Sequence, residues 1–345
     1  MKTLKKVAIL TSGGDAPGMN ACIRSITLTA LAHNLTVVGF KHGYNGLLAN
    51  EQQPLNEKIV RQVIHLGGTL LKSARCPQFV EVAAAKKAAA VLDSSDIDVL
   101  FVIGGDGSFM GAQHLANHWQ GQIIGLPGTI DNDIDGTDTT IGYYTAMDTA
   151  LDAIDKIRDT ADAFERIFIV EVMGRNSGFL ALNVGIACAA EQIICNDFYP
   201  DGKVELSAII EHIQQALVTR HDSSYIIVLM ENLWPGGAAG LAQTLNEQLH
   251  VDCRPCVLGY IQRGGSPVSK DRIVATKLGA AAVEAALNGE DAVMIGELNG
   301  QLSIYPLAKT GLQQKTVDPF LLRIQQTIFD NGDNVDKSSE HKPLS

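Results

Sequence analysis

Short apolar runs that end in a glycine-rich or polar loop recur along this chain of 345 residues. The runs are Val7–Leu10, Leu35–Phe40, Val99–Ile103, Ile123–Leu126, Ile167–Val172, Tyr225–Leu229 and Cys256–Ile261. Most are apolar throughout and alternate with helical patterns, which is typical of parallel strands covered by helices on both faces. The pattern therefore predicts an α/β fold with mostly parallel sheets.

Polar motifs follow the carboxyl ends of these predicted strands. In an open α/β sheet that edge is where ligands bind, so we expect several of the motifs to form one binding site. The formal net charge of -11 argues against a nucleic-acid or membrane surface as the partner. No apolar stretch in the sequence reaches membrane-spanning length.

The segment PGTIDND at residues 127–133 holds two carboxylates, an amide and a hydroxyl. One interpretation is an Asx-rich turn, because Asp and Asn side chains bond readily to nearby backbone. The other is a site in which Asp131 or Asp133 faces a substrate hydroxyl or a metal ion, since such groups cost stability when buried without partners. Spacing alone does not choose between the two carboxylates.

Two glycine pairs, in GGD at residues 13–15 and GGDGS at residues 104–108, each lie between a predicted strand and a helix. Glycine lets backbone N–H groups approach an anion, and the helix N-terminus adds a favourable dipole. Either pair alone is explained by a tight turn, but two pairs that each carry an Asp favour phosphate binding. Neither is a Walker loop or a GxGxxG motif. Asp106 is a candidate Mg²⁺ ligand, because Mg²⁺ prefers carboxylate oxygens.

Arg175 and Arg263 stand in loops beside glycines, after predicted strands. Guanidinium groups bind phosphate through paired hydrogen bonds. A phosphoryl transferase needs a phosphate cradle, Mg²⁺, cations for the developing charge and a carboxylate base. Each part has a candidate here, with Asp131 or Asp133 as the base.

Six cysteines lie among apolar residues, which is typical of reduced thiols and favours a cytoplasmic location. Cys253 and Cys256 form a CxxC pair, but a zinc site would need a second pair and only His250 lies nearby. We therefore expect no metal site at that pair.

Five motifs occur along the chain, namely LTSGGDAPGMN (10–20), GGDGS (104–108), PGTIDND (127–133), EVMGR (171–175) and QRGGSP (262–267). Together, in this order and over about the first 290 residues, they resemble the bacterial ATP-dependent 6-phosphofructokinase family. The resemblance implies two similar doubly wound, Rossmann-like three-layer domains. It also implies ATP-dependent phosphorylation of the 1-hydroxyl of fructose 6-phosphate, a glycolytic reaction.

The resemblance assigns roles to residues of the reacting centre. Asp131 matches the catalytic base, Thr129 a transition-state and sugar contact, and Asp133 a supporting carboxylate. Asp106 matches the Mg²⁺ ligand. The residues that match the ATP site are Gly14, Arg75, Cys76, Gly105, Gly107 and Ser108.

The resemblance also implies a sugar-phosphate site. Arg175 matches the arginine over the transferring phosphoryl group, and Arg263 matches a ligand of the 6-phosphate. Three further sugar contacts are matched by Met173, Gly174 and Glu231. The resemblance adds Arg166 and Arg254 from a neighbouring subunit, which implies a homo-oligomer, a tetramer in most bacterial relatives.

The domains implied are an ATP-binding domain, residues 1–141 plus about 256–305, and a sugar-phosphate domain, about 142–255 plus 306–330. No low-complexity linker divides them, so we expect the chain to cross between domains more than once. Residues 331–345 are polar, and we expect a disordered tail.

Two glycines bear on the phosphoryl donor. Pyrophosphate-dependent relatives usually carry Asp where this chain has Gly107 and Lys where it has Gly128, so we expect ATP. Two alternatives are a pyrophosphate-dependent enzyme and a noncatalytic regulatory paralogue, although the latter would have lost Asp131, Asp106 or Arg175. A lipid or NAD kinase shares the GGDG loop but lacks the QRGGSP and TIDND segments.

Two regions depart from the family pattern. Tyr260 replaces a usual histidine, so we expect weaker or less pH-sensitive 6-phosphate binding, which the pH dependence of KM would test. At the effector site, Arg24, Arg158 and Glu191 fit the pattern. The positions where it expects Arg, Arg and Lys hold Leu28, Glu57 and Asp222. We expect ADP activation and phosphoenolpyruvate inhibition to be weak or absent, because the local charge is less favourable to polyanions.

Overall fold

The structure, a computed structural model, describes residues 3–199, 201–219, 224–312 and 315–329. It divides into two compact units. Unit 1 comprises Met1–Ala153 and Leu258–Lys315, and unit 2 comprises Ile154–Val257 and the chain from Thr316 onward. The chain crosses between units after Ala153, Val257 and Lys315, where the sequence predicted boundaries near 141, 255 and 305. The tail expected at 331–345 lies outside the described residues.

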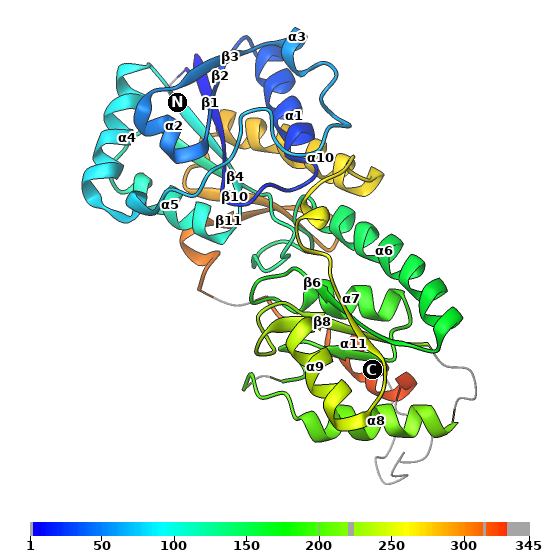
Figure 1. Cartoon of the computed structure of the whole chain (residues 1–345). Helices are drawn as coiled ribbons and strands as arrows, with labels where there is room; N and C mark the ends of the chain where they lie inside the picture. The colour runs from blue at the N-terminus through cyan, green and yellow to red at the C-terminus, as the bar shows by residue number, and fades with distance from the viewer. Residues whose placement is uncertain (1–2, 200, 220–223, 313–314, 330–345) are drawn as a thin grey trace, which may run out of the picture. The chain divides into compact units, whose positions relative to one another are not determined.

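Unit 1 contains a seven-stranded sheet in the order β11-β10-β5-β4-β1-β2-β3 (Figure 1). The strands are β1 (Lys6–Ser12), β2 (Thr36–Phe40), β3 (Gln52–Leu55), β4 (Val99–Gly104), β5 (Gln122–Pro127), β10 (Val293–Leu298) and β11 (Gln301–Pro306). The central pairs are parallel, and only the outer pairs β2–β3 and β10–β11 are antiparallel. The predicted mostly parallel sheet is confirmed.

Helices cover both faces of this sheet. Helices α1 (Met19–Ala32) and α10 (Ser269–Leu287) pack against each other on one face. The other face carries α2 (Gly43–Ala49), α4 (Val82–Ser94) and α5 (Asp106–Ala116), which share a buried core with β1, β4 and β5. Strands buried on both faces explain the continuous apolar runs in the sequence. The short α3 (Glu57–Val60) packs near α1.

Unit 2 contains a four-stranded, entirely parallel sheet in the order β7-β8-β6-β9. The strands are β6 (Ile167–Val172), β7 (Gln192–Ile194), β8 (Tyr225–Met230) and β9 (Cys253–Val257). The helices are α6 (Tyr143–Phe164), which begins in unit 1, and α7 (Phe179–Ala187), α8 (Leu206–Thr219), α9 (Gly237–Leu249) and α11 (Pro319–Phe329).

The strand predicted at 256–261 is wrong in its boundaries. β9 ends at Val257, and Gly259–Arg263 forms the 3-10 helix η2. Gly259 adopts a left-handed φ of 54°, a conformation open to glycine that takes the chain out of the strand. Among the described residues, no helix is long and apolar enough to cross a membrane.

Candidate active site

Three polar motifs leave the unit 1 sheet from adjacent strands at one edge. Ser12 of β1 is paired with Gly104 of β4, and Gly104 is paired with Pro127 of β5. A Cβ built on Gly105 would lie 3.5 Å from the Cβ of Thr129. The loops at 13–15, 104–108 and 127–133 therefore lie side by side, as the position of ligand sites in parallel sheets predicts.

The segment at residues 73–76 lies against the first of these loops. Ser73 Oγ donates a hydrogen bond to the carbonyl of Gly13 (2.7 Å), and Gly13 N–H donates to the carbonyl of Ala74 (3.4 Å). These bonds bring Arg75 and Cys76 to the same edge of the sheet. Burial raises the pKa of the Cys76 thiol, so the group stays protonated at neutral pH.

The second glycine loop forms the N-terminus of α5, which begins at Asp106. The N–H groups of a first helical turn lack helical partners and, with the helix dipole, favour a bound anion. A Cβ built on Gly107 would meet no atom within 4 Å. The loop therefore leaves open space beside Gly107, where the predicted nucleotide phosphates would lie.

Asp106 suits a magnesium ion that arrives with a nucleotide. A Cβ on Gly311 would lie 2.9 Å from Asp106 Oδ1, so the glycine there leaves the carboxylate uncrowded. Within the described ranges, no group of three His, Cys, Asp or Glu side chains could hold a metal. A single carboxylate fits Mg²⁺, which keeps several waters and binds substrate phosphates.

The loop at 127–133 is not an Asx turn at Asn132. The Oδ1 atom of Asn132 accepts a hydrogen bond from the backbone N–H of Thr140 (3.0 Å), eight residues further along. Thr140 Oγ1 donates to the carbonyl of Thr129 (2.6 Å), and Asp131 N–H donates to Thr129 Oγ1 (3.2 Å). Asp131 is 9% exposed and therefore lies in a buried loop that these hydrogen bonds hold in place.

Arg263 of η2 lies directly over the first glycine loop. Its Nη1 donates a hydrogen bond to the carbonyl of Asp15 (3.1 Å), and a Cβ on Gly14 would lie 2.6 Å from the same nitrogen. A side chain at position 14 would therefore displace the Arg263 guanidinium from this contact. The neighbouring Tyr260 is 84% exposed, so its side chain is accessible in the single chain.

A second group of predicted residues follows the strand ends in unit 2. Glu231 N–H donates to the carbonyl of Val172, which joins the ends of β8 and β6. Glu231 Oε1 accepts hydrogen bonds from the N–H groups of Gly174 (3.1 Å) and Arg175 (2.6 Å). Gly174 has a φ of 142° and Arg175 a φ of 58°. The Glu231 carboxylate therefore holds Met173–Arg175 in a strained turn.

Arg166 and Arg254 lie near the opposite, amino-terminal end of the same sheet. Both bind Asp252: the Nε atoms of Arg166 and Arg254 are each 2.6 Å from a carboxylate oxygen. Burial acts to raise the pKa of Asp252, but the hydrogen bonds from both arginines outweigh it and lower that pKa. Strand β6 separates Arg166 from Arg175 by about 20 Å, at about 3.3 Å per residue. Arg166 and Arg175 therefore lie at opposite ends of the same sheet.

One charged residue at the buried loop belongs to no sequence motif. Lys315 donates a hydrogen bond to Asn132 Oδ1 (3.0 Å) across 183 positions of sequence. Lys315 was not predictable from the sequence, because nothing in its local sequence indicates a site and the pairing follows only from the fold.

Comparison with known proteins shows the family to which the chain belongs. A family model described as Phosphofructokinase matches residues 6–286. The chain is 46% identical over 325 residues to ATP-dependent 6-phosphofructokinase 1 of Thermus thermophilus, a match that covers 94% of this chain and 99% of that protein. The chain belongs to the phosphofructokinase family. It is therefore a phosphotransferase.

Solved phosphofructokinase structures share this fold. The phosphofructokinase of Saccharomyces cerevisiae is 33% identical, with a TM-score of 0.80, over 89% of this chain and 45% of that chain. A pyrophosphate-dependent phosphofructokinase of Marinobacter aquaeolei has a TM-score of 0.79 at 24% identity, over 91% of this chain and 86% of that one. The second likeness shows the fold alone, so the fold does not decide the phosphoryl donor.

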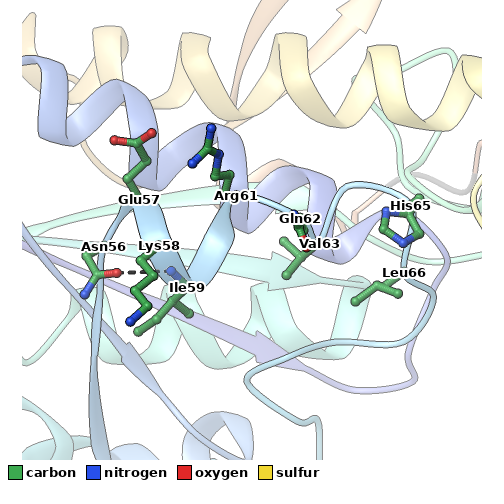
Figure 2. Close-up of a pocket in the computed structure, with 9 residues that line it drawn as sticks. All are labelled: Asn56, Glu57, Lys58, Ile59, Arg61, Gln62, Val63, His65 and Leu66. Atoms are coloured by element: carbon green, nitrogen blue, oxygen red, sulfur yellow. Dashed lines mark hydrogen bonds between the residues drawn. The ribbon is translucent and has the colours of Figure 1, made fainter.

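The pocket shown in Figure 2 includes Glu57, one of the positions that the sequence analysis compared with the effector pattern of the family. The pocket holds about 950 Å³ and is lined by residues 56–59, 61–63, 65 and 66. Figure 2 shows Glu57 and Arg61 pointing to the same side. Lys58 and Arg61 also line the pocket, so cationic side chains lie beside Glu57.

The other effector-site candidates fall into two groups. Arg24 and Leu28 lie on α1, which packs near α3. In unit 2, Arg158 is 3.2 Å from Glu191, whose other carboxylate oxygen accepts from the N–H of Ile226. Asp222 lies outside the described residues.

Proposed function

We propose that the chain is an ATP-dependent 6-phosphofructokinase, which transfers the γ-phosphoryl group of ATP to the 1-hydroxyl of fructose 6-phosphate in cytoplasmic glycolysis. The main support is the pairing of Ser12, Gly104 and Pro127 across adjacent strands. That register places a glycine loop, a candidate Mg²⁺ carboxylate and a buried candidate base next to one another. These are the parts that phosphoryl transfer requires.

The residues of unit 1 then divide the chemistry among them. Asp131 accepts the proton of the sugar 1-hydroxyl, and Thr129 contacts the reacting centre. Asp106 would hold Mg²⁺, which supplies charge neutralisation at the donor phosphates. Asp133 supports the loop. Backbone and side-chain groups of the ATP site orient the nucleotide, namely Gly14, Arg75, Cys76, Gly105, Gly107 and Ser108.

In unit 2, Arg175 stabilises the charge that develops on the transferring phosphoryl group. Glu231 fixes the backbone of Gly174 and Arg175 through the two hydrogen bonds to its Oε1. Met173 and Gly174 contact the sugar. The 6-phosphate is bound by Tyr260 and Arg263 of unit 1, together with Arg166 and Arg254 of a neighbouring subunit.

Two glycines support ATP over pyrophosphate as the donor. The open space at Gly107 leaves room for the α-phosphate of a nucleotide. A Cβ at Gly128 would lie 2.8 Å from Ile103 Cγ2, so a lysine there, as in pyrophosphate-dependent relatives, would require a shift of the β4 side chain. A steady-state assay with each donor separates the possibilities. Equal turnover with pyrophosphate would overturn the ATP assignment, and turnover with neither donor would favour a regulatory paralogue.

We further propose a homotetramer in which neighbouring subunits complete each site. The positions of Arg166 and Arg254 support sharing, because in one chain they lie at the end of the sheet opposite Arg175. Coexpressed Asp131→Asn and Arg254→Ala chains should recover activity well above either variant alone, since mixed oligomers contain some sites with both wild-type residues. Activity equal to the mean of the two variants would count against shared sites, and the mass of the oligomer checks its size.

Regulation by ADP and phosphoenolpyruvate should be weak or absent. Three cations of the family pattern are replaced here by Leu28, Glu57 and Asp222, which lowers the local charge by about five units. At close range this change weakens the binding of a polyanion by several kcal/mol. Fructose 6-phosphate saturation should therefore be hyperbolic and insensitive to both effectors. Sigmoidal kinetics that ADP relieves would contradict this expectation and would point to the cations of the pocket in Figure 2.

A further inference from the structure

The ammonium group of Lys315 contacts the buried loop at 127–133 and the segment that follows it. Its Nζ atom donates hydrogen bonds to Asn132 Oδ1 (3.0 Å) and to the carbonyl of Asp138 (2.7 Å). Lys315 follows the sheet's last strand, β11, in sequence and belongs to unit 1 like the loop itself. It therefore connects the loop, at Asn132, to a position six residues further along the chain.

Asn132 transmits this contact to the reacting centre. It is 3% exposed and has a left-handed φ of 54°, and its Oδ1 also accepts from the N–H of Thr140. Thr140 Oγ1 in turn donates a hydrogen bond to the carbonyl of Thr129, and the hydroxyl of Thr129 accepts one from the N–H of Asp131. A shift of Asn132 would displace Asp131, its neighbour in sequence, together with the bonds that fix Thr129.

Residues 135–138, which follow the loop, are held by contacts that do not involve Lys315. Tyr305 donates to Asp135 Oδ2 (2.6 Å), Ser303 donates to the carbonyl of Gly136 (2.8 Å), and Asp138 N–H donates to the carbonyl of Glu297 (2.6 Å). The β10–β11 hairpin thus fixes residues 135–138. Of the two Lys315 hydrogen bonds, the one to Asn132 is therefore the one that affects residues 129–133.

Keeping a cation at this place costs folding stability. Burial lowers the pKa of Lys315 to about 8, although Asp138, Asp133 and Asp135 partly offset the shift. The charged form is therefore less favourable in the folded protein than in the unfolded chain. Perturbed ionisable groups of this kind cluster at functional sites, where activity is kept at the expense of stability.

We propose that Lys315 is a positioning residue for phosphoryl transfer, whose ammonium group fixes Asn132 and thereby the orientation of Asp131 and Thr129. This inference rests on the proposed function of the loop. The competing explanation is a structural tie that only holds the chain near Lys315 against unit 1. If Lys315 is a positioning residue, kcat depends on its charge even when the stability of the protein is unchanged. If Lys315 is only a structural tie, kcat falls only when stability falls.

Replacing Lys315 by Met tests the inference, because Met keeps most of the side-chain volume and removes the charge and the donors. We expect kcat to fall about 10- to 100-fold, the KM for ATP to stay within about threefold, and the unfolding midpoint to stay within about 3 °C. Exchange of a buried charge for an apolar side chain is often neutral for stability. The matched control is Lys309→Met at an exposed lysine of η3 (Leu307–Lys309), which should leave all three quantities unchanged.

Rescue distinguishes a charge requirement from a packing defect. Lys315→Arg keeps a cationic donor and should recover much of the lost kcat, and methylammonium should raise the kcat of Lys315→Ala in a saturable manner. Wild-type kcat should fall above about pH 8 as Lys315 loses its proton, whereas Lys315→Arg should show no such fall. The groups that face Lys315 are Asp133, Asp135 and Asp138; Tyr305, whose hydrogen bond to Asp135 raises its pKa, stays protonated in this range.

The inference is overturned if Lys315→Met keeps kcat within about threefold of wild type. It is also overturned if kcat and the unfolding midpoint fall together and neither Arg nor methylammonium restores activity. Wild-type turnover of fructose 6-phosphate with ATP, measured in parallel, tests the proposed function independently of Lys315.

Discussion

Asp131→Asn is expected to lower kcat by about two to four orders of magnitude, the usual contribution of a general base, and to change the KM for ATP little. Asparagine has nearly the same shape as aspartate and can occupy the same buried position. The N–H of residue 131 can still donate to Thr129 Oγ1, a bond of 3.2 Å in the wild type. The loss would therefore report on proton transfer, and the unfolding midpoint should confirm that the loop still folds.

Asp133→Asn is the matched control, because Asp133 is the second carboxylate of the same loop and is less buried than Asp131. We expect a loss of about tenfold or less, in keeping with a supporting role. Near-wild-type turnover of Asp131→Asn with a large loss in Asp133→Asn would reverse the two assignments. This pair of variants decides a question that the spacing of the sequence left open.

Gly107→Asp is expected to lower kcat/KM for ATP by about two orders of magnitude. A carboxylate about 5 Å from a phosphate costs about 3 kcal/mol at an effective dielectric constant of 20. Folding should not suffer, because a Cβ at Gly107 meets no atom within 4 Å and an acidic residue suits the first turn of α5. The loss should appear in ATP kinetics and leave the unfolding midpoint unchanged or slightly raised.

Gly107→Asn separates charge from volume in this test, since asparagine matches aspartate in size without its charge. It should retain most of the ATP activity. Equal losses in both variants would mean that bulk rather than charge excludes the nucleotide. If Gly107→Asp bound ATP as well as wild type, the space beside Gly107 would not be the nucleotide phosphate site.

The parallel sheets were predictable because the strands are buried on both faces. Val99–Ile103, for example, is apolar throughout, and the structure places it within β4 with every residue buried. The β10–β11 hairpin was missed although its signal was present. Asn299 and Gly300 form its turn with left-handed φ values of 52° and 75°, and an Asn-Gly pair between alternating residues is typical of such hairpins.

The site was predictable where motifs directly follow strands. The sequence indicated the chemistry of the loops at 104–108 and 127–133, and the adjacency of β4 and β5 then brings them together. The role of Asn132 was not predictable, because its partners Thr140 and Lys315 are brought near only by the fold. The approach of Arg263 to Gly14 likewise joins residues that are far apart in sequence.

The most direct test of the proposed function is ³¹P NMR of the products formed by the wild-type chain from ATP, Mg²⁺ and fructose 6-phosphate. We expect fructose 1,6-bisphosphate and ADP in equal amounts, and almost no product from Asp131→Asn under the same conditions. A phosphoryl group on any other acceptor, or no transfer from ATP to the sugar at all, would contradict it.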